Sequence, residues 1–96
     1  MTKIVWSRRA NNDFDRIYRF WIDHNKSPNY SEKILDETLR MLDILRHQNK
    51  IGQKSKYKKI RRVLVLENFS ISYLLTENEI KILSFFDNRQ DPKRSI

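Results

Sequence analysis

Apolar residues recur every three or four positions in the first part of the chain. The first set is Ala10, Phe14, Ile17, Tyr18 and Trp21. This spacing places the set on one face of a helix. Ser7 is suited to cap the N-terminus of that helix, which we expect to end near His24–Asn25.

A second helical pattern follows the pair Ser27-Pro28, a combination that favours a helix start. Its apolar face comprises Tyr30, Ile34, Thr38, Met41, Leu42 and Leu45, widened by Leu35 and Leu39. A widened face is typical of a helix that packs on more than one neighbour. We expect the helix to fade between His47 and Lys50, so that the two helices form an antiparallel hairpin.

Short apolar runs outside these helices predict strands. The runs are Lys3–Trp6, Ile60–Leu66, Phe69–Leu75 and Glu79–Phe86. The two-residue gaps Glu67-Asn68 and Glu77-Asn78 predict tight hairpins. The order β-α-α-β-β-β predicts a single α+β domain over residues 1–96, with a two-helix hairpin packed on one face of a small antiparallel sheet. Residues 87–96 read as a polar C-terminal tail.

Two-residue hairpins also fix which side chains share a face of the sheet. With Leu66 opposite Phe69, the predicted core is Phe14, Trp21, Ile34, Leu42, Leu64, Ile71, Tyr73 and Ile82. The face away from the helices would then carry Arg61, Val63, Val65, Leu74, Lys81, Leu83 and Phe85. An apolar set on an uncovered face predicts a groove for a partner.

Composition narrows the class of protein. The chain has no cysteine, which excludes disulfides, thiolate metal sites and cysteine nucleophiles. No apolar run approaches the ~20 residues that span a bilayer, and the N-terminus does not resemble a signal peptide. We expect a cytoplasmic protein with no metal, no cofactor, no small-molecule substrate and no membrane partner.

The net charge of +8 is concentrated in the second half of the chain. Residues 49–96 have 11 Lys+Arg and 5 Asp+Glu, a net charge of +6, whereas residues 1–48 have 9 and 7, a net charge of +2. Seven cations fall within thirteen residues: Lys50, Lys54, Lys56, Lys58, Lys59, Arg61 and Arg62. This segment predicts a surface for phosphate or for an acidic partner, with a merely solubilising loop as the alternative.

Three segments resemble the RelE/ParE toxin family of bacterial type II toxin–antitoxin systems. They are IVWSRRANNDFDRIY near the N-terminus, the basic hairpin IRRVLVLENFSISYLL, and ILSFFDNRQDP towards the C-terminus. The resemblance spans nearly the whole chain and implies a fold with two helices against an antiparallel sheet. It also implies an antitoxin partner that holds the protein inactive.

The resemblance leaves the target open. RelE-like members cleave messenger RNA on the ribosome with basic residues of the open sheet face and of the tail. The corresponding positions here are Arg61, Val63, Ser70 and Arg89, of which Val63 and Ser70 cannot supply charge. The family's tail tyrosine has no counterpart, since no Tyr follows Tyr73.

We therefore expect a ParE-like toxin that inhibits growth by binding a target such as DNA gyrase. The first alternative is a ribosome-dependent mRNA interferase, a metal-independent endoribonuclease using Arg61 and Arg89 as catalytic residues. A further alternative is a non-toxic nucleic-acid-binding module. Residues expected to bind the target or the antitoxin are Lys58, Lys59, Arg61, Arg62, Val63, Lys81, Leu83 and Phe85. We expect Asp87 and Arg89 to fix the tail by a local salt bridge.

Overall fold

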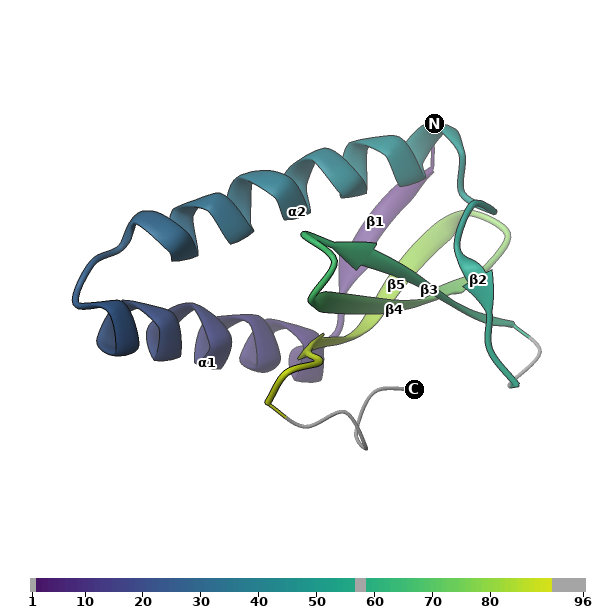
Figure 1. Ribbon diagram of the computed structural model, residues 1–96. Coiled ribbons are helices and arrows are strands. Elements are labelled where there is room, and N and C mark those ends of the chain that lie inside the picture. The colour runs from purple at the N-terminus through teal and green to yellow at the C-terminus, as the bar shows by residue number, and fades with distance from the viewer. Residues whose placement is uncertain (1, 57–58, 91–96) are drawn as a thin grey trace.

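Two helices lie against a five-stranded sheet in the computed structural model, which describes residues 2–56 and 59–90 (Figure 1). The elements are β1 (Lys3–Trp6), α1 (Arg8–Asn25), α2 (Asn29–His47), β2 (Gln53–Lys54), β3 (Ile60–Val65), β4 (Phe69–Leu75) and β5 (Glu79–Asp87). The predicted α+β arrangement of a two-helix hairpin on a sheet is confirmed.

The sheet is mixed rather than purely antiparallel. Its strand order is β1-β5-β4-β3-β2, and β3, β4 and β5 form the predicted antiparallel meander. The first strand, β1, pairs in parallel with the last strand, β5. The short β2 pairs with β3 inside the region expected to be a loop. The pairing of β1 with β5 does not follow from a local pattern, because both helices and three strands separate these two strands in the chain.

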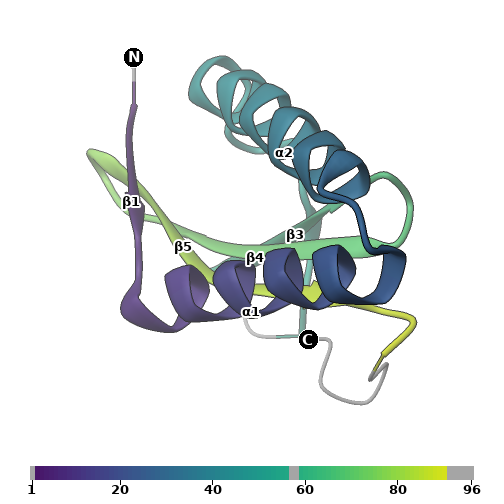
Figure 2. The same cartoon turned by 90° about the vertical axis from the view of Figure 1, so that its left-hand side faces the viewer.

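The two helices begin and end close to the predicted positions. The Ser7 hydroxyl accepts a hydrogen bond from the backbone N–H of Ala10 at 3.0 Å, which caps α1. Lys26 ends α1 in the left-handed conformation, with φ of 56°. The helices then run antiparallel (Figure 2). Within residues 2–56 and 59–90, neither helix is long and apolar enough to cross a membrane.

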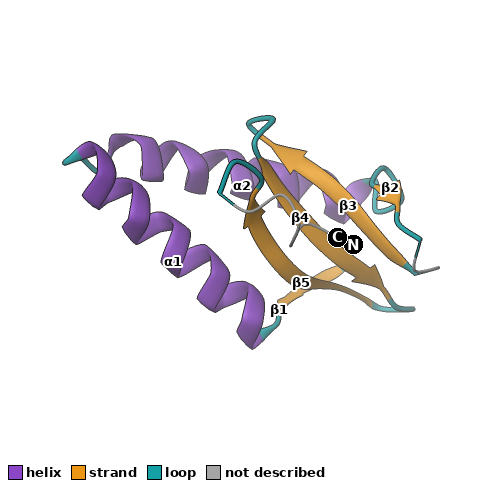
Figure 3. Ribbon diagram, turned by 60° about the horizontal axis from the view of Figure 1, so that its bottom comes forward, coloured by secondary structure: helices purple, strands orange, loops and turns teal. Residues whose placement is uncertain are grey.

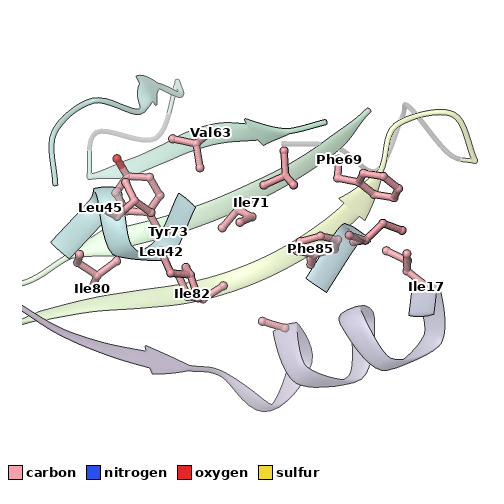
Figure 4. Close-up of a cluster of buried hydrophobic side chains, with 13 residues drawn as sticks. Ile17, Leu42, Leu45, Val63, Phe69, Ile71, Tyr73, Ile80, Ile82 and Phe85 are labelled. Carbon is pink, nitrogen blue, oxygen red and sulfur yellow. The ribbon is translucent and has the colours of Figure 1, made fainter. Parts of the chain in front are cut away.

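The core lies between the helices and one face of the sheet (Figure 4). Five of its predicted members are buried: Ile34, Leu42, Ile71, Tyr73 and Ile82. Phe14 and Trp21 are half-buried and pack against this cluster. The ring of Phe14 meets that of Phe85 edge-on, with centroids 5.0 Å apart, and so links α1 to β5.

The predicted register of β3 is wrong by one residue. Val65, not Leu66, lies opposite Phe69, so the connection has three residues. Leu66 and Glu67 both adopt left-handed backbone conformations, with φ of 51° and 63°, which the sequence pattern did not predict. A one-residue shift exchanges the two faces of a strand. Val63 and Val65 are therefore buried, and Leu64 is 49% exposed instead of belonging to the core.

The predicted faces of β5 are wrong beyond Ile82. The pairing with β4 shifts by one residue at this point, so that Ser84 lies opposite Ser72 and Phe85 lies opposite Ile71. Such a bulge inserts one extra residue, here Leu83, and reverses the alternation beyond it. Phe85 is consequently buried in the core instead of lining an open face. Asp87, expected to begin the tail, is the buried last residue of β5.

Candidate binding surfaces and arginine sites

Arg61 holds the loop that leads from α2 into the sheet. Its guanidinium Nη1 donates hydrogen bonds to the backbone carbonyls of Gly52 at 2.9 Å and Lys50 at 3.1 Å. Arg61 lies opposite Tyr73 in the sheet and so belongs to the helix-facing side, not to the open face expected for it. Its donor groups are thus partly committed to the chain's own backbone.

Tyr73 completes this arrangement from β4. Its hydroxyl accepts a hydrogen bond from the Gly52 N–H at 3.0 Å and donates one to the Asn49 carbonyl at 2.9 Å. Burial raises the pKa of the Tyr73 phenol, and the Gly52 hydrogen bond and the charge of Arg61 offset this only in part. The phenol is therefore held neutral as a structural hydrogen-bonding group.

Arg89 lies against a set of aromatic rings at the end of β5. Its guanidinium carbon is 4.7 Å from the centre of the Trp21 ring and 5.2 Å from that of Phe69. The predicted salt bridge to Asp87 is present, with Arg89 Nε 3.1 Å from Asp87 Oδ1. Arg89 also donates to the Tyr30 hydroxyl at 2.9 Å. This anchors the chain beyond β5 to both helices.

The charge of Arg89 is stabilised in this position. Burial by itself lowers the pKa of the guanidinium, but the hydrogen bonds with Asp87 and Tyr30 outweigh burial, and the pKa is raised. The carboxylate of Asp87 accepts a further hydrogen bond from Trp21 Nε1 at 3.0 Å. Sequence reasoning missed this Trp21–Asp87 contact, because the two residues are distant in the chain and Trp21 was assigned to the core alone.

The structure does not bring Arg61 and Arg89 together. Arg61 lies opposite Tyr73, and Arg89 packs on Phe69. Phe69 and Tyr73 are four residues apart in β4, which corresponds to about 13 Å along an extended strand. Figure 4 shows these two residues at opposite ends of the core. A single phosphate group would not contact both guanidinium groups in this arrangement.

The basic segment leads into β3. Lys59 is exposed, and Arg62 is half-buried on the sheet face away from α2. Lys58 lies outside the described residues. Lys81 is exposed on the same face as Arg62, because Lys81 lies opposite Leu74, two residues after the Arg62 partner Ser72. Among the predicted binding cations that the structure describes, Lys59 and Lys81 are therefore exposed, and Arg61 and Arg62 are half-buried.

The face of β3, β4 and β5 away from α2, turned towards the viewer in Figure 3, is called here the outer sheet face. It comprises Ile60, Arg62, Leu64, Ser70, Ser72, Leu74, Lys81, Ser84 and Phe86, of which Ser70, Ser72, Ser84 and Phe86 are buried. The guanidinium of Arg9 lies 5.3 Å from the centre of the Phe86 ring and adds a cation from α1. Of the apolar groove expected here, Val63, Val65 and Phe85 face the core, and Leu83 is half-buried at the bulge.

The comparisons with known proteins agree with this architecture. Residues 4–92 match the family model described as "ParE toxin of type II toxin-antitoxin system, parDE". A search of curated proteins found no match. Since the family model covers most of the chain, it establishes the family.

Solved structures share the fold at low sequence identity. A chain of the chromosomal ParDE toxin–antitoxin system from P. aeruginosa is 22% identical with a TM-score of 0.76, covering 91% of this chain and 96% of its own. YoeB from Staphylococcus aureus, solved as a dimer, is 17% identical with a TM-score of 0.62, covering 86% and 92%. YafQ from E. coli is 15% identical with a TM-score of 0.53, covering 94% and 97%. The chain belongs to the family of ParE toxins of type II toxin–antitoxin systems.

Proposed function

We propose that this toxin inhibits growth by binding DNA gyrase in the cytoplasm and that a cognate antitoxin neutralises it. The family match supports the toxin assignment. The observation that favours binding over RNA cleavage is the placement of Arg61 and Arg89, the two candidate catalytic cations. Each is engaged by the protein itself, and they lie at opposite ends of the sheet.

Metal-free RNA cleavage requires a group that activates the ribose hydroxyl, an acid for the leaving oxygen, and cations that offset the phosphate charge. Arg61 is bonded to backbone carbonyls, and Arg89 is bonded to a buried carboxylate. Tyr73 is buried and already makes two hydrogen bonds. These contacts favour structural roles for the three side chains.

The exposed cations Lys59 and Lys81, together with Arg62, form the proposed contact surface for acidic groups. Lys58 belongs to the same proposal on the strength of the sequence alone. Charged contacts between exposed groups weaken as salt screens them, so binding through this surface depends on ionic strength. The acidic groups would come from the target or from the antitoxin.

A supercoiling assay tests the target. Purified toxin at micromolar concentration should block supercoiling of relaxed plasmid by gyrase, and Lys59→Glu should weaken this inhibition. Lys33→Glu is the matched control, because it makes the same charge change at an exposed lysine on α2. Gyrase that supercoils normally at this toxin concentration would contradict the proposal.

Translation reactions test the alternative of an mRNA interferase. If the toxin cleaves ribosome-bound mRNA and Arg61→Ala abolishes cleavage without unfolding the protein, RNA cleavage is the function. A chain whose expression leaves growth unchanged would instead be a non-toxic nucleic-acid-binding module. Intact mRNA, combined with growth arrest and gyrase inhibition, is the outcome that supports the proposal.

A further inference from the structure

A group of cations lies at the edge of the sheet that β2 forms. We call it the basic edge, and its members are Lys50, Lys54, Lys59 and Arg61. The three lysines are exposed, and Arg61 is half-buried. Lys54 lies opposite Arg61 in the pairing of β2 with β3, and the carbonyl of Lys50 accepts a hydrogen bond from Arg61 Nη1 at 3.1 Å. Lys59 comes two residues before Arg61, a span of at most about 7 Å.

The loop that carries the first two lysines is held by hydrogen bonds to the sheet. The Tyr73 hydroxyl donates to the carbonyl of Asn49 at 2.9 Å and accepts from the N–H of Gly52 at 3.0 Å. The short strand β2 continues this segment and pairs with β3. The backbone at Lys50 and Lys54 is therefore positioned before any partner binds, which lowers the entropy cost of binding.

The lysines of the basic edge are not neutralised by ion pairs within the protein. The sequence has no acidic residue between Asp43 and Glu67. Within residues 2–56 and 59–90, none of Lys50, Lys54 and Lys59 forms an ion pair. Like charges that gather in this way repel one another and destabilise the compact state. A polyanionic partner would relieve this repulsion, so the basic edge is suited to bind one.

We infer that the basic edge binds the phosphate backbone of the DNA on which gyrase acts. The inference rests on the proposed function, which supplies gyrase and hence its DNA. The surface proposed to contact acidic groups, at Lys59, Arg62 and Lys81, shares Lys59 with the basic edge. A toxin that contacts both the enzyme and its DNA binds the gyrase–DNA complex more tightly than it binds gyrase alone.

The lysines favour DNA over an acidic protein segment as the partner. Lys is depleted in protein–protein interfaces, whereas Lys contacts with phosphates contribute much of the sequence-independent affinity for DNA. Lys54 also lies on an edge strand, where a charged side chain discourages pairing with a strand of another protein. A flexible ammonium group can meet a phosphate without a fixed geometry. We therefore expect binding that does not depend on the DNA sequence.

The salt dependence of DNA binding tests the basic edge directly. The full chain is titrated into duplex DNA of mixed sequence, and the association constant is measured by fluorescence anisotropy between about 50 and 200 mM salt. Four phosphate contacts predict that the logarithm of this constant falls against the logarithm of the salt concentration with a slope of about −3 to −4. The double variant Lys50→Gln, Lys54→Gln should lower the magnitude of the slope by about 2 and weaken binding about tenfold at the lowest salt.

The matched control is the double variant Lys26→Gln, Lys33→Gln. These two exposed lysines lie near the turn between α1 and α2, at the end of the molecule away from β2 (Figure 1). The control makes the same change of net charge and should keep the slope and the affinity within about twofold of the wild type. Circular dichroism should show that both double variants are folded. If they lower DNA affinity equally, binding reflects net charge alone and the inference is overturned.

A second measurement connects DNA binding to gyrase. The affinity of the toxin for purified gyrase is measured with and without bound duplex DNA. DNA should tighten binding of the wild type about tenfold and leave that of the Lys50→Gln, Lys54→Gln variant nearly unchanged. Both proteins should bind DNA-free gyrase with equal affinity, because neither lysine belongs to the surface proposed to contact acidic groups.

The outcomes distinguish the inference from the proposed function. If the toxin inhibits gyrase but DNA does not change its affinity for gyrase, the inference is overturned and the proposed function stands. If the Lys50→Gln, Lys54→Gln variant instead loses affinity for DNA-free gyrase or for the antitoxin, the basic edge binds an acidic protein surface and the inference is again overturned. If the toxin does not bind gyrase at all, the proposed target is wrong, and the slope measured with free DNA still decides whether the basic edge binds phosphates.

Discussion

The carboxylate of Asp13 accepts a hydrogen bond from the backbone N–H of Phe85, 3.1 Å away and 72 residues later in the chain. Among the described residues, β1 pairs with β5 as far as Ile82, and no strand lies beside Phe85 on that edge. Asp13 replaces the missing strand by one side-chain acceptor. Arg16 and Arg9 also form ion pairs with Asp13, at 3.2 Å and 3.7 Å, and so balance the charge of the buried carboxylate.

Removing this acceptor should destabilise the protein. Asp13→Ala leaves the Phe85 N–H buried without a partner, which costs about 1–3 kcal/mol of unfolding free energy. Asp15→Ala is the control, since Asp15 is exposed and forms an ion pair with the exposed Arg19, and its cost should stay under about 0.5 kcal/mol. Urea denaturation of both variants provides the comparison, and equal costs would contradict a structural role for Asp13.

The register of β3 can be tested with one charged residue at neighbouring positions. Val63→Asp should prevent folding, because it buries a carboxylate in the core. Leu64→Asp should fold, because Leu64 is exposed on the outer sheet face. Circular dichroism distinguishes the two. The opposite result would contradict this register. If Val63→Asp folded and Leu64→Asp did not, the register expected from a two-residue hairpin would be the correct one.

The contact between Gly52 and Tyr73 leaves no room for a larger residue. A Cβ atom at position 52 would lie against the Tyr73 hydroxyl and 2.8 Å from its Cε1 atom. Gly52→Ala should therefore destabilise the protein by about 1–3 kcal/mol, the usual cost of overpacking. In a double-mutant cycle, Tyr73→Phe should reduce this cost, because it removes the atom in closest contact. Strictly additive effects would show that the two residues are not coupled.

The raised pKa of Tyr73 also leads us to expect that the stability of the protein depends on pH in the alkaline range. Its pKa in the folded protein is raised, mainly by burial, so the unfolded state loses the phenolic proton first. Above the ordinary tyrosine pKa of about 10, the unfolded state binds fewer protons and stability falls as pH rises. Denaturation from pH 9 to pH 11 should show a steeper loss for the wild type than for Tyr73→Phe. If stability fell equally with pH in the wild type and in Tyr73→Phe, the pKa of Tyr73 would not be raised by folding.

Arg89 should contribute to stability through its shape as well as its charge. Arg89→Ala removes the contacts with Trp21, Phe69 and Asp87, at a cost of about 1–2 kcal/mol. Arg89→Lys should restore little, because an ammonium group cannot stack and bond in the same plane. The chain has a second tryptophan, Trp6, so the variants are compared in a Trp6→Phe background, where the fluorescence of Trp21 reports on this site during denaturation. If Arg89→Lys were as stable as the wild type, charge attraction alone would account for the contribution of Arg89.

The helices were predictable because their patterns are local. The spacing of Phe14, Ile17 and Trp21 and the cap at Ser7 fixed α1 within a few residues. The same holds for the hairpin pairing of Leu75 with Ile80, which the two-residue gap Glu77-Asn78 predicted and the structure has.

The faces of β3 and β5 could not be predicted from alternation alone. One additional residue in the turn at Leu66 and one at Leu83 each reverse a face, and neither has a glycine or proline to mark it. The candidate site shifted accordingly, since Val63 and Phe85 moved from the surface to the core. The salt bridge of Arg89 with Asp87 was predicted and is present. The hydrogen bonds of Arg61 to the carbonyls of Lys50 and Gly52 were not predicted, because they depend on loop geometry that no sequence spacing specifies.

The parallel pairing of β1 with β5 has a consequence for the order of events during synthesis. Residues Lys3–Trp6 leave the ribosome well before their partners Glu79–Ile82. The sheet therefore cannot close until β5 has been synthesised, and any activity that needs the finished fold begins only after that point. A chain that terminates before β5 lacks the strand that pairs with both β1 and β4.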